Sequence, residues 1–121
     1  MARRVLIVDD ALIMRKRIRE IAEQAGWEVA GEAADGEEAV ALYKSERPDL
    51  VTLDIVMPKM DGVTALKRLM ATDAAARVVM ISAVDQRAKL IECLDHGAID
   101  FIVKPFDAAR LRKLFDRYLV A

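Results

Sequence analysis

The chain has 121 residues, 55% of them hydrophobic, which fits one globular domain over residues 1–121. Its 19 basic and 20 acidic residues leave a formal net charge of -1, so no global field draws it to nucleic acid or anionic lipid. The single cysteine, Cys93, excludes an internal disulfide framework, and the apolar run after residue 4 is too short for a signal peptide. We therefore expect a cytoplasmic protein that binds neither nucleic acid nor membrane.

Short apolar runs rich in Val, Ile and Leu alternate with segments of helical period. The first run, residues 4–8, ends at Asp9 and Asp10, and the following helix carries an apolar stripe that stops near Gly26. A weaker strand over residues 28–33 contains a glycine and a charged glutamate, which favours an edge position in the sheet. Charged residues lie off the first helix's stripe and indicate a solvated face: Arg15, Lys16, Arg19 and Glu23.

The same alternation continues through the middle of the chain. A second helix extends from residue 36 to Glu46 and is ended by Pro48. A mainly apolar strand then reaches Asp54, and a third helix starts near Gly62. In the loop between them a glycine is expected to allow backbone angles that other residues resist.

The last third of the chain completes the pattern. A strand over residues 78–81 ends at Ser82, and a helix follows from about residue 87 to residue 96. The final strand ends at Lys104, and Asp107 is the expected N-cap of the last helix. Five βα repeats of this kind predict one doubly wound α/β domain, with a parallel sheet covered by helices on both faces.

Reactive side chains follow four of the five predicted strands: Asp9, Asp10, Asp54, Ser82 and Lys104. A single aspartate at such a junction is more often a helix N-cap than a ligand, but two in a row cannot both cap. Because ligands of open α/β sheets bind at the carboxyl ends of the strands, we expect these side chains to meet there. Each pair of carboxylates at 4 Å would repel by about 4 kcal/mol, so a cation is needed.

Carboxylate oxygens on an incomplete cage favour Mg²⁺, which shares its octahedron with water and phosphate oxygens. The three carboxylates, one Mg²⁺ and the Lys104 ammonium sum to zero charge, which suits a site that receives a phosphoryl group. No histidine or phosphate-binding glycine loop lies near these strand ends, so the nucleophile is expected to be a carboxylate. Asp54 is the best candidate, because Asp9 and Asp10 are better placed as the metal pair.

Four sequence blocks together resemble the signature of response-regulator receiver domains: residues 8–10, 54–62, 81–83 and 101–106. The resemblance spans the whole chain and is greatest to the single-domain chemotaxis-type members. It implies a flavodoxin-like (βα)5 fold with the strand order 2-1-3-4-5.

The resemblance also implies residue roles. Asp54 would accept phosphate from the phosphohistidine of a partner kinase. Asp10, Asp54 and the backbone carbonyl of Val56 would bind Mg²⁺, with Asp9 acting largely through water. Lys104 would pair with the phosphoryl oxygens. Such a domain catalyses its own phosphoryl transfer and dephosphorylation, but it is not a turnover enzyme on an external substrate.

Two further residues are implied to form the switch. Ser82 would move to hydrogen-bond the phosphoryl group, and the ring of Phe101 would then turn inward into the space released. Pro105 resembles the family's cis-proline, which would orient the lysine before it. The resemblance makes the fourth helix, fifth strand and fifth helix the expected output face, and makes the first helix a kinase- or phosphatase-docking side.

The expected partners are a histidine kinase as phosphodonor and a downstream target protein, with a phosphatase as an option. A flagellar-motor switch protein is the natural candidate for the target. A stand-alone receiver can equally relay phosphate or be a domain excised from a multidomain regulator.

Three other classes of protein compete with this interpretation. A magnesium phosphatase of the haloacid-dehalogenase type would have a second acid two residues after its nucleophile, where this chain has Val56. A flavin-binding module would want a Ser/Thr/Gly-rich loop after the first strand. A receiver used only for docking would be expected to lack one of the acids or Lys104, and all are present.

Overall fold

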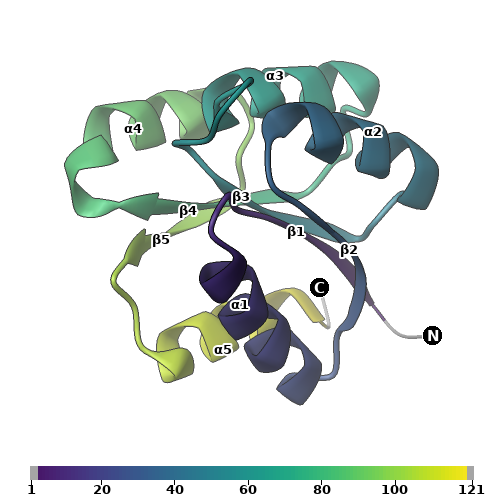
Figure 1. The fold of residues 1–121 in the computed structure, drawn as a ribbon, viewed down its shortest axis with the longest axis vertical. Coiled ribbons are helices and arrows are strands. Elements are labelled where there is room, and N and C mark those ends of the chain that lie inside the picture. The colour runs from purple at the N-terminus through teal and green to yellow at the C-terminus, as the bar shows by residue number, and fades with distance from the viewer. Residues whose placement is uncertain (1–2, 120–121) are drawn as a thin grey trace.

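The computed structural model describes residues 3–119 and contains one five-stranded parallel sheet with the order β2-β1-β3-β4-β5 (Figure 1). The strands are β1 (Arg4–Val8), β2 (Glu28–Ala33), β3 (Leu50–Asp54), β4 (Val78–Ala83) and β5 (Asp100–Lys104). The helices are α1 (Leu12–Gln24), α2 (Gly36–Glu46), α3 (Gly62–Thr72), α4 (Arg87–Asp95) and α5 (Ala108–Leu119), with a short 3₁₀ turn, η1 (Val84–Gln86), before α4. The predicted fold class and strand order are both confirmed.

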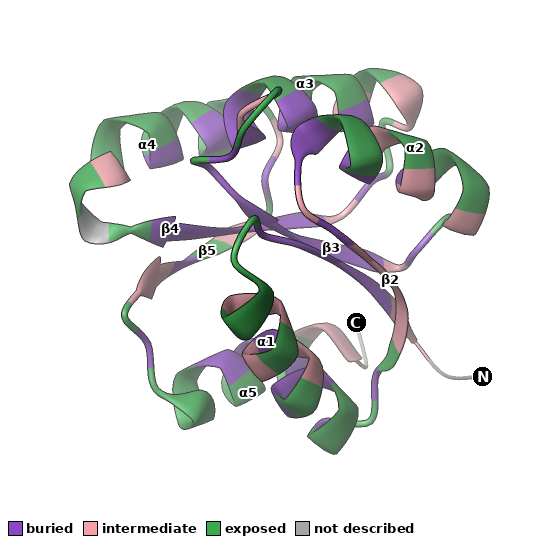
Figure 2. Ribbon diagram, in the orientation of Figure 1, coloured by how far each residue is buried: buried purple, intermediate pink, exposed green. Residues whose placement is uncertain are grey.

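The helices form two layers around the sheet. Helices α1 and α5 cover one face, and α2, α3 and α4 cover the other (Figure 1). Side chains alternate between these faces along each strand, so that Val5 and Ile7 of β1 pack toward α1 and α5 while Leu6 and Val8 pack toward the opposite layer. Burial follows the same plan, because the central strands are buried and the outer helix surfaces are exposed (Figure 2). Strand β2 lies at the sheet edge, as predicted, and is only partly buried.

Aspartate side chains cap the N-termini of α2, α3 and α5. Asp35 accepts a hydrogen bond from the Glu38 amide, Asp61 from the Thr64 amide and Asp107 from the Arg110 amide, each at 2.8–2.9 Å. Helix α1 begins after Ala11 without any side-chain cap. Asp9 and Asp10, at the end of β1, therefore do not cap α1.

The role of Gly62 differs from the prediction. Left-handed backbone angles occur at Gly26 (φ 89°) and Gly97 (φ 105°), which follow α1 and α4, whereas Gly62 is the first residue of α3. A Cβ at Gly62 would lie 2.0 Å from the Asp54 carbonyl oxygen and 2.7 Å from the Ile55 Cα. Glycine is needed there because two stretches of backbone approach closely, and the left-handed angle in this loop belongs to Lys59 (φ 66°).

Among the described residues no helix combines the length and the apolar character that crossing a bilayer requires.

Candidate functional site

The sheet register brings the predicted site residues to one edge. Val8 of β1 pairs with Leu53 of β3, and Asp54 pairs with Ile81 of β4. Lys104 of β5 pairs with Ala83, one residue beyond Ser82. Because every strand is parallel, the residues at these carboxyl ends face the same set of loops, as the sequence predicted.

Three carboxylates converge there. Asp9, Asp10 and Asp54 each offer one oxygen, and these oxygens lie within 4.8 Å of one another. Asp9 and Asp54 are buried, with 1% and 7% of their surfaces exposed, whereas Asp10 is exposed. The buried pair is held by neighbouring backbone: the Ala11 amide donates to Asp9 Oδ1 at 2.9 Å and the Ile55 amide to Asp54 Oδ1 at 2.8 Å.

Lys104 neutralises part of this negative charge. Its Nζ lies 2.7 Å from Asp9 Oδ2 and 3.3 Å from Asp54 Oδ2. Burial alone would lower the pKa of Lys104, but the hydrogen bond to Asp9 and the charge of Asp54 outweigh it and raise that pKa. The raised pKa favours the charged ammonium, which offsets one of the three carboxylate charges.

The arrangement also changes the acidity of the phosphoacceptor candidate, Asp54. Burial raises the pKa of Asp54, and although the Lys104 charge opposes the effect, the neighbouring Asp9 charge reinforces it. A divalent cation at the three carboxylates would favour the ionised form, which is the nucleophilic one.

The donor set fits Mg²⁺ rather than a softer metal. All three groups are carboxylates, which are hard oxygen ligands, and the remaining charge matches one divalent ion. Within residues 3–119 the Asp10 carboxylate makes no hydrogen bond or ion pair, so it is free to bind an ion from the solvent side. Val56 lies two residues after Asp54 with an exposed side chain, and its carbonyl as a ligand stays a prediction.

The two predicted switch residues lie on strands β4 and β5. Ser82 is fully buried, and its hydroxyl donates to the Ala83 carbonyl at 3.2 Å. The Phe101 side chain points outward, with 42% of the residue exposed, and borders a cavity of about 290 Å³. The cavity is otherwise lined by Ala83, Arg87, Leu90, Ile91, Leu94 and Val103. The inward turn that the resemblance implies for Phe101 stays a prediction.

Two arginines on α1 bind backbone carbonyls at or near the site, and the sequence did not predict these contacts. Arg15, predicted to lie on a solvated face, donates from Nη1 to the Asp9 carbonyl at 2.7 Å, and its side chain is only 15% exposed. Arg17 donates to the Phe106 carbonyl at 2.8 Å and stacks over the Phe106 ring at 4.8 Å. Phe106 follows the cis peptide bond between Lys104 and Pro105, which the family resemblance predicted. Helical periodicity cannot reveal these contacts, because they depend on which loop lies opposite each arginine.

Comparison with known proteins gives the same picture. The model of the family described as "Response regulator receiver domain" matches residues 5–116. The chain is 50% identical over 119 residues to the chemotaxis protein CheY of Bacillus subtilis, covering 98% of this chain and 99% of that protein. It is 51% identical over 111 residues to the chemotaxis protein CheY of Thermotoga maritima, covering 92% of each.

A solved structure with the same fold is the CheX-CheY-BeF3-Mg+2 complex from Borrelia burgdorferi. Its matching chain has 47% sequence identity and a TM-score of 0.88, over 92% of this chain and 84% of that one. That structure contains Mg²⁺, which is the ion the carboxylate cluster fits.

Proposed function

The chain belongs to the response-regulator receiver family, and from this premise we propose that it is a chemotaxis-type switch phosphorylated on Asp54. The observation that carries the proposal is the Asp54 carboxylate itself. It is buried, it lies 3.3 Å from the Lys104 ammonium, and one of its oxygens lies within 4.8 Å of oxygens from Asp9 and Asp10. We infer that residues 1–121 form a single receiver domain of a signalling protein and not a turnover enzyme.

Each site residue has a distinct part in the proposed reaction. A carboxylate oxygen of Asp54 attacks the phosphorus of a phosphohistidine, the P–N bond breaks, and its electron pair leaves with the imidazole nitrogen. Lys104 then pairs with the phosphoryl oxygens. Asp10, Asp54 and the Val56 carbonyl would hold Mg²⁺, with Asp9 acting through water. The bound ion would supply positive charge to the equatorial oxygens of the phosphoryl group.

The switch would follow from the new phosphoryl oxygens. Ser82 exchanges its hydrogen bond to the Ala83 carbonyl for one to the phosphoryl group, and Phe101 turns inward from its exposed position. This movement changes the apolar cavity that Phe101 borders, which is where a target protein would read the signal. The Asp54 phosphate is later lost by hydrolysis at the same site.

The proposed partners are a histidine kinase and a target, for which a flagellar-motor switch protein is the natural candidate in a chemotaxis pathway. The Borrelia relative was solved together with CheX, which supports protein partners of this kind, and a phosphatase would be a further one. These partners would meet the protein in the cytoplasm. A phosphorelay shuttle is the second candidate, since the same site can both accept and return a phosphoryl group.

The test is mass spectrometry of the intact protein after incubation with acetyl phosphate, with and without Mg²⁺. We expect a single phosphoryl adduct on the parent protein with Mg²⁺ and none on Asp54→Asn. The matched control is Asp61→Asn, because asparagine caps helix α3 as well as aspartate does and the site is unchanged. An unmodified parent would leave a docking module as the function, and an adduct on Asp54→Asn would identify another nucleophile.

A further inference from the structure

Helix α1 reaches the metal-binding edge through one side chain, Arg15. Its Nη1 donates to the backbone carbonyl oxygen of Asp9 at 2.7 Å, and its Nε donates to the Glu32 carboxylate at 3.1 Å. The guanidinium therefore bridges the end of β1 and the edge strand β2. Its side chain is 15% exposed, so most of it is withdrawn from solvent.

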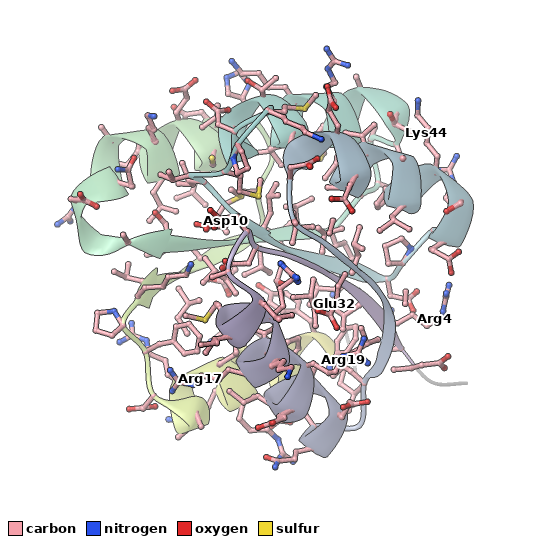
Figure 3. The ribbon with its side chains drawn as sticks, viewed as in Figure 1. Arg4, Asp10, Arg17, Arg19, Glu32 and Lys44 are labelled. Carbon is pink, nitrogen blue, oxygen red and sulfur yellow. The ribbon has the colours of Figure 1, made fainter. Side chains whose placement is uncertain are left out.

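Glu32 is itself held in place from two sides. Arg15 contacts its Oε1, and Arg19, one turn further along α1, contacts its Oε2 at 2.7 Å. Figure 3 shows Glu32 beside Arg19 of α1, with Asp10 in the loop between β1 and that helix. A carboxylate fixed by two guanidinium groups holds the Arg15 fork at a defined orientation.

We propose that Arg15 is a positioning residue of the Mg²⁺ site, acting through the peptide group that joins Asp9 to Asp10. The Asp9 carbonyl belongs to that peptide group, so the hydrogen bond from Arg15 fixes its plane. The orientation of the plane in turn sets the direction in which the Asp10 side chain leaves the backbone. This inference rests on the proposed function, because it assumes that Asp10 binds the ion.

Asp10 depends on its backbone more than its neighbours do. Asp9 is held at every polar atom: its amide donates to the Ala33 carbonyl at 3.0 Å, its carbonyl accepts from Arg15, and its carboxylate binds Lys104 and the Ala11 amide. Within the described residues the Asp10 side chain has no such contacts. The position of the Asp10 carboxylate is therefore set by the backbone alone. This matters because Mg²⁺ tolerates little departure from octahedral geometry.

The guanidinium also has an electrostatic effect. The Asp9 carbonyl oxygen carries a partial negative charge, and Arg15 places a positive charge against it. Without this contact the peptide group between Asp9 and Asp10 would be free to rotate. The Asp10 carboxylate would then be displaced with it.

A simpler alternative is that the arginine pair only ties α1 to the edge of the sheet. Arg19 separates the two explanations, because it shares Glu32 with Arg15 but makes no contact with Asp9. Arg19→Gln removes one of the two ion pairs that tie α1 to Glu32 of β2 and leaves the Asp9 carbonyl bond in place. Arg15→Gln removes the other ion pair together with the bond to the Asp9 carbonyl.

The experiment is isothermal titration calorimetry of Mg²⁺ binding to the parent protein, Arg15→Gln and Arg19→Gln. Urea unfolding measured alongside establishes that each variant is folded. We expect the Mg²⁺ Kd of Arg15→Gln to rise about 10-fold, the lower end of what loss of an outer hydrogen bond to a metal site costs. The Kd of Arg19→Gln should change by less than about 2-fold. In ¹H–¹⁵N spectra the Asp10 amide should shift in Arg15→Gln alone.

A third variant tests the bridge directly. Arg15→Lys keeps the charge but has one donor nitrogen in place of the fork, so its Kd should stay close to that of Arg15→Gln. A parent-like Kd for Arg15→Lys or Arg15→Gln, or an equal loss in Arg19→Gln, overturns the positioning role. A parent protein that binds no Mg²⁺ overturns the proposed function as well, so the two failures are distinguishable.

Discussion

Replacing Gly62 by alanine tests the packing beneath the phosphoacceptor. The added Cβ would lie 2.0 Å from the Asp54 carbonyl oxygen and 2.7 Å from the Ile55 Cα, both of them backbone atoms. Ordinary contact begins at 3.4 Å, so the start of α3 and the end of β3 must separate by more than 1 Å. The Gly62 amide also donates to the Ile55 carbonyl at 2.7 Å, and this bond opposes the separation.

The free energy of unfolding should fall as a result. Overpacking usually costs about 1–3 kcal/mol, and rigid backbone atoms on the opposite side place this case at the upper end. Alanine favours helix over glycine by up to about 1 kcal/mol, which offsets part of the loss. We therefore expect Gly62→Ala to be less stable by about 2–3 kcal/mol, within the margin that a folded domain of this size can lose.

Urea unfolding followed by circular dichroism measures the difference. The matched control is Gly31→Ala on β2, where the atoms nearest to the new Cβ would belong to the Leu42 and Leu6 side chains at 3.7–3.9 Å. That variant should stay within about 1 kcal/mol of the parent. If Gly62→Ala proves as stable as Gly31→Ala, the close approach of α3 to β3 is not the reason for glycine at this position.

Three smaller predictions follow from buried polar groups. Thr52 is fully buried and its hydroxyl has no hydrogen-bond partner within residues 3–119. Thr52→Val should therefore raise the free energy of unfolding by about 1 kcal/mol and move the urea midpoint upward. A lower midpoint would contradict this. Burial, and then the hydrogen bond to Asp73, raise the pKa of Tyr43 from 10.0 to about 12. Because the folded state holds this proton more tightly, Tyr43 contributes stability that is fully present below pH 10.0 and is lost as the pH rises to about 12. The free energy of unfolding should therefore fall less steeply with pH over this range in Tyr43→Phe than in the parent, and equal slopes would refute the reasoning. Burial also raises the pKa of the Cys93 thiol to about 11, so iodoacetamide should modify it only after unfolding, as mass spectrometry would show.

Much of the fold could be predicted from the sequence, because the hydrophobic patterns and the helix-capping residues indicated the same elements. The apolar strands and Asp107 lie where their patterns placed them, and the boundaries of β2 agree at both ends. The three aspartates and Lys104 meet because parallel strands leave their carboxyl ends at one edge, a consequence that follows once the order of elements is known. The strand order came from resemblance to a family, since periodicity alone does not say which strands are neighbours.

The features that the sequence did not predict correctly share a physical cause. Arg15 lies off the apolar stripe of α1 and was assigned to solvent, yet its long side chain reaches back to the Asp9 carbonyl. Gly62 was expected to allow backbone angles that other residues resist, whereas the constraint comes from the Asp54 backbone across the loop. The 3₁₀ turn η1 was not predicted either. Each of these features depends on which residues lie opposite in the folded structure, and the residue pattern of one segment does not reveal those neighbours.

The distance along the chain between Asp9 and Lys104 has a consequence for synthesis. The two residues are separated by 95 positions and Asp54 and Lys104 by 50, yet each pair forms an ion pair. A nascent chain that has emerged only as far as β4 would contain the phosphoacceptor without the lysine that completes the site. In such a fragment the carboxylates of Asp9 and Asp54 would lack the ammonium that pairs with both of them. The charge arrangement of the site is therefore complete only after β5 has joined the sheet.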